Sequence, residues 1–257
     1  MKIGQFESEF GYFIGLELDG KWINYSKASS AFYLLMHGIS LLHRPTIESL
    51  LERGQFDVEE FRAVAAFVKK HRLQPAVAMP REYLLRAPVM RPRKIIALGL
   101  NYALHVKEGS LDKPKEPVIF MKATSAICGP DDPIVVPRGA EKVDWEVELA
   151  VIIGKRLASS TPQDSLRGIF GYTCANDVSA RDLQFGDKQW VRGKSLDTFG
   201  PIGPQLVLAE DLREPQNLRI QCRLNGNTVQ DSNTRHMIFP IPQIVAFVSK
   251  NFTLMPG

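Results

Sequence analysis

Cysteine is scarce in this sequence and forms no recognisable pattern. Cys128, Cys174 and Cys222 are the three cysteines among 257 residues, and they lie far apart. An odd and widely spaced set excludes a disulfide framework and a CxxC metal-binding motif. Apolar or strand-like neighbours surround each of them, which indicates buried free thiols. A reducing compartment follows as the default, and we expect the cytoplasm.

The sequence also lacks segments that would bind or cross a membrane, or bind nucleic acid. No uncharged apolar run reaches the length of about 18 residues that a membrane-spanning helix needs. Glu7 and Glu9 interrupt the first residues, which is unlike a signal peptide. The net charge is +4, but Lys and Arg are dispersed and form no basic run or tail. We therefore expect no membrane or nucleic-acid partner, and a small anionic substrate suits the mild excess of positive charge.

The chain divides into parts that differ in pattern. Residues 1–75 predict a small domain with a hairpin and two short helices, which Thr46 and Asp57 would cap. Residues 76–93 are punctuated by proline and predict an extended linker. Residues 94–257 are rich in strand-like runs with few helices, so we predict an α+β fold in place of a doubly wound sheet.

Local signals within these parts predict turns and helix starts. Asp19-Gly20 and Asn225-Gly226 each separate two alternating runs, a pattern that is typical of tight hairpins. Thr161-Pro162 predicts a helix start, because proline is favoured at the first helical position.

The stretch "KVDWEVELAVIIGK", residues 142–155, predicts a strand with an acidic face. Asp144, Glu146 and Glu148 occupy every second position, and apolar residues fill the gaps. Since side chains alternate along a strand, the three carboxylates would share one face and repel one another. Either that face is solvated, or a cation lies there.

Asp177, in "CANDVSARDLQ", could complete such a cation site. It follows a strand-like run, where a lone aspartate is usually a helix cap or a turn residue. Together with Glu146 and Glu148, however, it would supply a third oxygen ligand. Such a carboxylate site suits Mg²⁺ or Mn²⁺, suits Ca²⁺ less strictly and does not suit Zn²⁺.

Other ionisable residues could carry chemistry beside that site. His105 and Glu108, in "GLNYALHVKEG", are three residues apart and would face the same side of a helical turn. A carboxylate that orients an imidazole is the arrangement of a general base, although such pairs are also common on surfaces. Lys122 and Lys194 follow apolar or glycine-containing segments and are either solvated charges or groups that stabilise a developing anion.

Several blocks in fixed order resemble one known family, the fumarylacetoacetate hydrolase family, and within it the small branch with a single catalytic domain. The resemblance runs from residue 94 to residue 257. The blocks that carry it are "GLNYALHVKE", "EPVIFMKATSAICGP", "VDWEVELAVIIGK", "GYTCANDVSARDLQ", "KQWVRGKSLDTFGPIGP" and "LNGNTVQDSNTRHMIFP".

This resemblance implies a mixed β-roll that binds a divalent metal, usually in a homodimer. It assigns roles to matching positions: metal ligands at Glu146, Glu148 and Asp177, a water-activating pair at His105 and Glu108, and substrate contacts at Lys122, Gln184 and Lys194, with Arg181 a weaker match. Asp144 matches no usual ligand. Family members also continue beyond the position of Gly257 into a strand and a Gly-Thr-Pro loop, so we expect the natural protein to extend further.

The implied activity is metal-dependent cleavage of a carbon–carbon bond in an acylpyruvate-type 2-oxo acid. His105 with Glu108 would activate water, and Lys194 would stabilise the charge that develops. The same centre could instead decarboxylate oxaloacetate, interconvert its keto and enol forms, or isomerise a diacid of the 2-hydroxyhepta-2,4-diene-1,7-dioate type. An inactive homologue that still binds metal is a further alternative, and all of these stay open at this stage.

Overall fold

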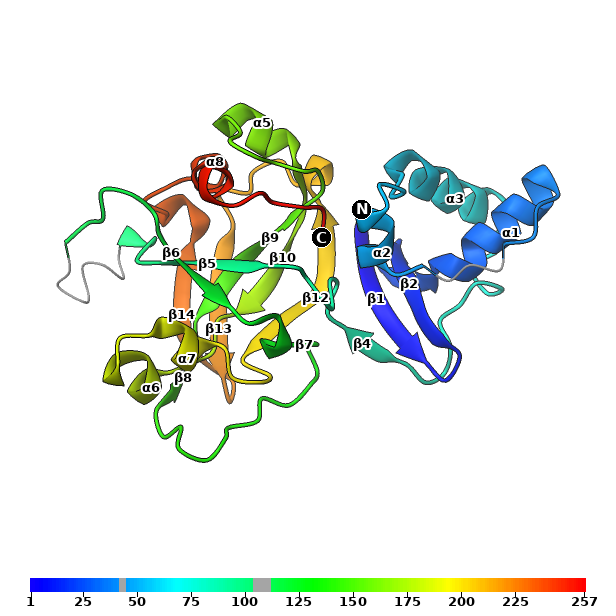
Figure 1. Ribbon diagram of the computed structural model, residues 1–257. Coiled ribbons are helices and arrows are strands. Elements are labelled where there is room, and N and C mark those ends of the chain that lie inside the picture. Colours follow the sequence, from blue (N-terminus) through cyan, green and yellow to red (C-terminus); the bar gives the residue numbers. More distant parts are fainter. Residues whose placement is uncertain (42–44, 104–111) are drawn as a thin grey trace.

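The computed structural model describes residues 1–41, 45–103 and 112–257, and it confirms an α+β fold (Figure 1). Within these residues one eight-stranded sheet and three two-stranded sheets are formed. The paired strands run antiparallel except β7, which runs parallel to β12. The large sheet is therefore mixed in direction, in keeping with the predicted mixed β-roll.

Runs of strands are separated by single helices or groups of helices along the chain. The strands are β1 (Lys2–Ser8), β2 (Gly11–Leu18), β3 (Lys21–Asn24), β4 (Leu84–Arg86), β5 (Ile95–Gly99), β6 (Val118–Lys122), β7 (Ile127–Cys128), β8 (Val143–Asp144), β9 (Val147–Ile153), β10 (Ile169–Asn176), β11 (Ser179–Ala180), β12 (Gly200–Leu208), β13 (Arg219–Leu224) and β14 (Asn227–Asn233). The α-helices are α1 (Tyr25–His37), α2 (Ile47–Glu52), α3 (Val58–Lys70), α5 (Pro162–Arg167), α6 (Arg181–Gly186), α7 (Trp190–Lys194) and α8 (Ile241–Asn251), and short 3₁₀ turns lie at Thr124–Ala126, Ala209–Asp211 and Thr234–His236.

The predicted helix caps and hairpin turns are confirmed. Thr46, Asp57 and Thr161 are the N-cap residues of α2, α3 and α5, and each side chain accepts a hydrogen bond from a first-turn N–H. Asp19-Gly20 and Asn225-Gly226 turn the hairpins β2–β3 and β13–β14, and all four residues have positive φ. Positive φ at both central residues is the geometry of the tight hairpin turn that these dipeptides favour.

The N-terminal elements are joined to the remainder through the large sheet. Its strand order is β3-β2-β1-β12-β10-β9, so β1 pairs with β12, with Ile3 opposite Leu206. One hydrophobic cluster contains Ile3 and Phe61 together with Ile152 and Leu206. The predicted parts 1–75 and 94–257 thus share a sheet and a core, and their division into separate domains stays a prediction.

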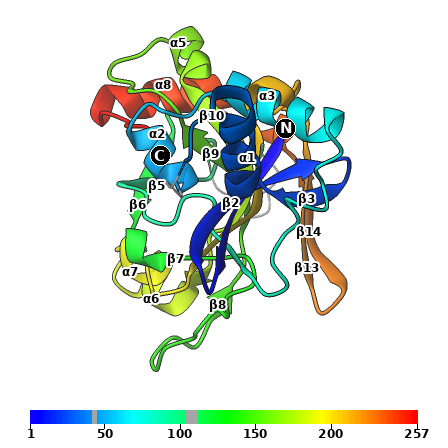
Figure 2. The same ribbon diagram turned by 90° about the vertical axis from the view of Figure 1, so that its right-hand side faces the viewer.

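Two further clusters support the remainder of the chain. Helix α8 packs Ile241, Val245 and Val248 with Tyr172 of β10, next to α5, and Phe199 is the centre of a smaller cluster. Figure 2, in which the N-terminal elements face the viewer, shows the β13–β14 hairpin extending along one side of the molecule. Residues of this hairpin and of β9 line the cavity described below.

The prediction of three buried thiols is confirmed only for Cys128. Cys174 is exposed and Cys222 is partly buried. Cys174 follows the buried Thr173 on β10, and successive side chains of a strand point to opposite faces. The adjacent side chains of Thr173 and Ala175 therefore lie on the other face of the sheet from this thiol.

Candidate active site

A cavity of about 850 Å³ contains the predicted site residues that the structure describes. Strands β5, β9 and β14 and helix α8 contribute to its walls. The predicted residues among those that line it are Lys122, Glu146, Glu148, Asp177, Arg181, Gln184 and Lys194. His105 and Glu108 lie outside the described residues. A second cavity of about 1080 Å³, beside Phe56 and Phe170, contains none of these side chains.

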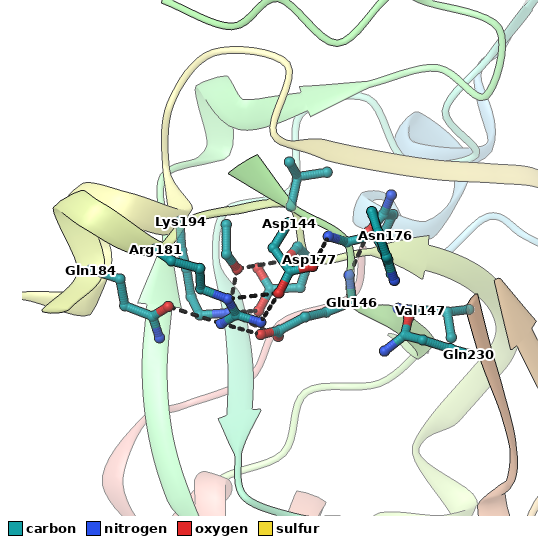
Figure 3. Close-up of polar contacts among 12 residues, drawn as sticks. Asp144, Glu146, Val147, Asn176, Asp177, Arg181, Gln184, Lys194 and Gln230 are labelled. Carbon is teal, nitrogen blue, oxygen red and sulfur yellow. Dashed lines mark hydrogen bonds and ion pairs between the residues drawn. The ribbon is translucent and has the colours of Figure 1, made fainter. Parts of the chain in front are cut away.

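Lys194 is the centre of the polar contacts in this cavity (Figure 3). Its Nζ donates hydrogen bonds of 2.8 Å to Glu146 Oε2, 2.8 Å to Asp177 Oδ2 and 2.8 Å to Ser179 Oγ. The side chain is 2% exposed, and its Nζ lies 5.1 Å from the ring centre of Phe120. A charge that is this deeply buried requires partners of opposite charge, and the two carboxylates provide them.

Two other cations neutralise the remaining oxygens of the same carboxylates. Lys122 Nζ lies 2.5 Å from Asp177 Oδ1, and Arg181 Nη1 lies 2.6 Å from Glu146 Oε1. Burial lowers the pKa of Lys122, and the charge of Asp177 opposes that shift. Each carboxylate of this pair therefore contacts two cationic side chains.

Arg181 extends the network to Asp144, outside the cavity, and to Gln184, which lines it. Its Nη2 lies 2.7 Å from Asp144 Oδ2, and its Nη1 also donates to Gln184 Oε1 at 2.9 Å. Asp144 does not line the cavity, in keeping with its lack of a match to a family ligand. Asp144 thus orients Arg181, while Glu146 and Glu148 line the cavity.

Glu148 is the carboxylate of the cavity that lacks a cationic partner among the described residues. Neither an ion pair nor a hydrogen bond reaches its side chain from them. Burial raises its pKa to about 8; the negative charges of Glu146 and Asp177 reinforce the shift, and Lys194 opposes it. The protonated carboxyl therefore predominates at neutral pH until a cation stabilises the ionised form.

The predicted strand over residues 142–155 is interrupted at Trp145 and Glu146. Strand β8 pairs with β11 and strand β9 pairs with β10, so the two halves belong to different sheets. Side chains accept the hydrogen bonds of three successive N–H groups here: Asp144 from Trp145, Asn176 from Glu146, and Gln230 from Val147. The prediction of one continuous strand is therefore wrong. At these positions side chains, and not a neighbouring strand, accept the hydrogen bonds of the backbone N–H groups.

The carboxylates fit a hard divalent cation in the chemistry of their donors, because Mg²⁺ and Mn²⁺ prefer oxygen ligands. Within the part of the chain that is described, however, no three His, Cys, Asp or Glu side chains are grouped as a metal site. The ammonium group of Lys194 lies between Glu146 and Asp177 and contacts an oxygen of each. Coordination of one ion by Glu146, Glu148 and Asp177 requires Nζ to move, and this ligand set stays a prediction.

Sequence reasoning missed several residues of the site. Tyr102 lines the cavity, and its hydroxyl is buried without a hydrogen-bond partner among the described residues. Burial, and then the charge of Glu148, raises the Tyr102 pKa. Asn176, Ser179 and Gln230 contact the acidic segment or Lys194 directly. The resemblance included the blocks that contain them, but no local pattern marked these polar residues as parts of the site.

Comparison with known proteins identifies the family. The family described as "Fumarylacetoacetate (FAA) hydrolase C-terminal" matches residues 94–257. The chain belongs to the fumarylacetoacetate hydrolase family. This confirms the resemblance carried by the sequence blocks, over the same range of residues.

A curated relative within this family is a bovine protein, "Oxaloacetate tautomerase FAHD2A, mitochondrial" [Bos taurus]. It is 45% identical over 215 residues, which is 82% of this chain and 66% of the relative. The chain thus spans slightly less than two thirds of that protein's length.

Within the described residues, no helix has both the length and the apolar character needed to span a bilayer.

Solved structures of family members share the fold. Fumarylacetoacetate hydrolase from Exiguobacterium antarcticum has a TM-score of 0.76 and 32% identity, covering 100% of this chain and 83% of that one. Maleylpyruvate hydrolase from Sphingobium, in complex with manganese(II) ion and pyruvate, has a TM-score of 0.72 and 28% identity, covering 100% of this chain and 86% of that one. The fold predicted from the resemblance is confirmed.

Proposed function

We propose that this protein is an enzyme that interconverts the keto and enol forms of a small 2-oxo diacid such as oxaloacetate. The observation that carries the proposal is the group of Lys122, Arg181 and Lys194 at one end of the cavity. Three cationic side chains at one place can bind an anionic substrate and stabilise an enolate oxygen. The name of the bovine relative, an oxaloacetate tautomerase, supports the same activity.

We also propose that the enzyme uses a divalent metal, Mg²⁺ or Mn²⁺, with Ca²⁺ a poorer fit. Glu146, Glu148 and Asp177 would hold it, and the manganese in the Sphingobium relative supports a divalent ion. When bound, such an ion acts as a Lewis acid that polarises the 2-oxo group. The positive charge would also favour the ionised form of Glu148, whose pKa is otherwise raised to about 8.

The chain's own side chains would bind the substrate and stabilise its charge. Lys194 Nζ, which must leave its carboxylate partners when the metal binds, would donate to the 2-oxo oxygen as negative charge develops there. Arg181 already contacts Asp144, Glu146 and Gln184, so it would reach a substrate carboxylate through its one remaining N–H. Gln184, 3% exposed, is held by its bond to Arg181 and would supply an amide donor. His105 with Glu108 is predicted to move the proton at the neighbouring carbon.

Tautomerisation is favoured over hydrolysis because it requires less of the site. It needs substrate binding, stabilisation of one oxygen and a proton carrier, whereas hydrolysis also requires an activated water. Cleavage of an acylpyruvate is the second candidate, because two related structures are hydrolases. The 2-oxo acid substrate and the homodimer stay proposals. The cytoplasmic location is also a proposal; the bovine relative, by contrast, is named as mitochondrial.

The decisive experiment follows the ultraviolet absorbance of the oxaloacetate enol with Mg²⁺ or Mn²⁺ present. The protein should accelerate the exchange, and Lys194→Met should slow it by about 10²–10³-fold, the usual loss for a single oxyanion donor. Lys155→Met is the matched control, because Lys155 is exposed and does not line the 850 Å³ cavity. Pyruvate release from oxaloacetate and from an acylpyruvate, measured in parallel, separates decarboxylation and hydrolysis. No acceleration with either metal would contradict the proposal.

A further inference from the structure

We infer that Gln230, on the β13–β14 hairpin, is a positioning residue that fixes Glu146 and Glu148 relative to each other for binding one divalent cation. This inference rests on the proposed function. Gln230 is not proposed to contact the metal or the substrate. It acts through the backbone between the two glutamates.

The contact that carries the inference is a single hydrogen bond. Oε1 of Gln230 accepts from the backbone N–H of Val147 at 2.8 Å (Figure 3). Val147 lies between Glu146 and Glu148, so its amide belongs to the first of the two peptides that separate them. Rotation of that peptide would move one glutamate relative to the other.

The other side of the same peptide unit is also held. The carbonyl oxygen of Glu146, which belongs to that unit, accepts from the N–H of Asp177 at 2.8 Å, and in the preceding peptide the N–H of Glu146 donates to Asn176 Oδ1 at 2.9 Å. Asn176 and Asp177 both belong to the β10 side of the segment. Gln230 therefore supplies the restraint on the N–H side of this peptide, and it does so from a different sheet.

The position of Val147 in the sheet explains why a side chain must supply this bond. Strand β9 is the last strand in the order β12-β10-β9, so no strand among the described residues is hydrogen-bonded to its other edge. The Val147 N–H would otherwise remain unpaired at that edge. Metal ligands must be held to within about half an ångström to bind well, so a mobile peptide here would weaken the site.

The hairpin that presents Gln230 is itself well anchored. Beside it, Arg219 Nη2 forms an ion pair of 2.6 Å with Asp231 Oδ2, which ties β13 to β14. Where the hairpin ends, Thr234 is 1% exposed and bonds to Leu218 N and Pro215 O. These contacts hold the hairpin that carries Gln230 in place. Gln230 itself lies 83 residues along the chain from Val147.

The variants that test this role change only the acceptor. Gln230→Leu removes the acceptor with little change of volume, and Gln230→Glu replaces the amide oxygen with a carboxylate oxygen at the same reach. Gln221→Leu is the control: Gln221 lies on the facing strand and bonds to Thr228 and Asp231, with no bond to residues 146–148. Thermal unfolding of each variant confirms that it is folded before it is compared.

The first measurement is amide hydrogen exchange at Val147 by NMR, without metal. Loss of one hydrogen bond, worth about 1 kcal/mol net, should speed exchange about 5-fold in Gln230→Leu. The second is Mn²⁺ affinity by calorimetry, which should fall about 5-fold or more in the same variant. Gln230→Glu should bind Mn²⁺ at least as well as wild type, and Gln221→Leu should match wild type in both measurements.

The outcomes separate this inference from the proposed function. If wild type binds Mn²⁺ and Gln230→Leu binds it equally well, the positioning role is wrong while the metal site stands. An equal loss in Gln221→Leu would also overturn the role, because it would show a general effect on the hairpin. If wild type binds no Mn²⁺, the proposed metal site fails and the positioning role fails with it. Unchanged exchange at Val147 in Gln230→Leu would overturn the hydrogen bond itself.

Discussion

In the proposed metal site, Glu148 would link the stability of the fold to metal binding. It is a partly buried carboxylate near two others, Glu146 and Asp177, and burial together with their charges raises its pKa to about 8. In the unfolded chain the pKa of a glutamate is about 4.3. Between these two values the folded state therefore binds more protons at this position than the unfolded state does.

The sign of the resulting pH dependence follows from linkage. Where the folded state binds the extra proton, the free energy of unfolding falls as pH rises, by up to about 1.4 kcal/mol per pH unit for one proton. We predict that Glu148→Gln removes this contribution in EDTA, so that it gains stability relative to wild type between pH 5 and pH 8. Urea unfolding across this range measures the difference, with the exposed Glu141→Gln as control. Parallel pH curves for wild type and Glu148→Gln would show that Glu148 ionises freely in the fold.

Which residues enter the site could be predicted, but their contacts could not. Residue type and the order of blocks were enough to select Glu146, Asp177, Lys122 and Lys194 as a group. The ion pair between Lys194 and Glu146 spans 48 residues, and that pairing is set by packing across the fold. No local pattern states that two buried lysines would neutralise carboxylates that were chosen as metal ligands.

At the scale of elements, the close approach of α6 and α7 places Lys194. Gly193 precedes it, and a Cβ at Gly193 would lie 2.6 Å from Ala180 O, 2.7 Å from Gln184 N and 2.8 Å from Gln184 Cβ. Two of these atoms belong to the backbone and cannot move aside without shifting α6. The missing side chain therefore allows α7 to bring Lys194 beside the start of α6.

We predict that Gly193→Ala separates the two helices and displaces Lys194 from Glu146 and Asp177. Activity in the enol assay should fall at least about 10-fold. The free energy of unfolding should fall by about 1–3 kcal/mol, the usual cost of overpacking. Gly186→Ala on α6 is a matched control, because nothing lies within 4 Å of a Cβ there. Unchanged activity and stability in Gly193→Ala would show that the helices accommodate the methyl group.

Elements with local causes were predicted well, and those with distant causes were not. The Thr46 and Asp57 caps and the Asn225-Gly226 turn depend on residues within a few positions of one another, so the sequence contains their signals. The interruption at Trp145 and Glu146 depends on Asn176 and Gln230, which lie in other strands. Period-two alternation continues across the interruption, so the pattern alone could not reveal it.

At the scale of the whole molecule, the family resemblance predicted the fold but not how the N-terminal residues pair with the family-matching part of the chain. The sequence suggested a small N-terminal domain, a linker and a catalytic domain. In the structure β1 pairs with β12, and β4, within the predicted linker, pairs with β1. Strand pairing between segments about 200 residues apart leaves no local signature, because the alternation of each strand is the same whichever partner it has.

This joining gives a prediction for the fragment of residues 94–257, the range that matches the family. Leu206 and Leu208 on β12 are 0% and 1% exposed in the full chain and pack in a cluster with Ile3, Ile14 and Phe61. Removing residues 1–93 would expose that apolar surface and open the edge of β12 for pairing with other molecules. We expect the fragment to aggregate or to lose cooperative unfolding, as measured by size-exclusion chromatography and thermal melting beside the full chain. A soluble fragment with a cooperative transition near that of the full chain would instead show that residues 94–257 form an independent domain, and that β1 only covers it.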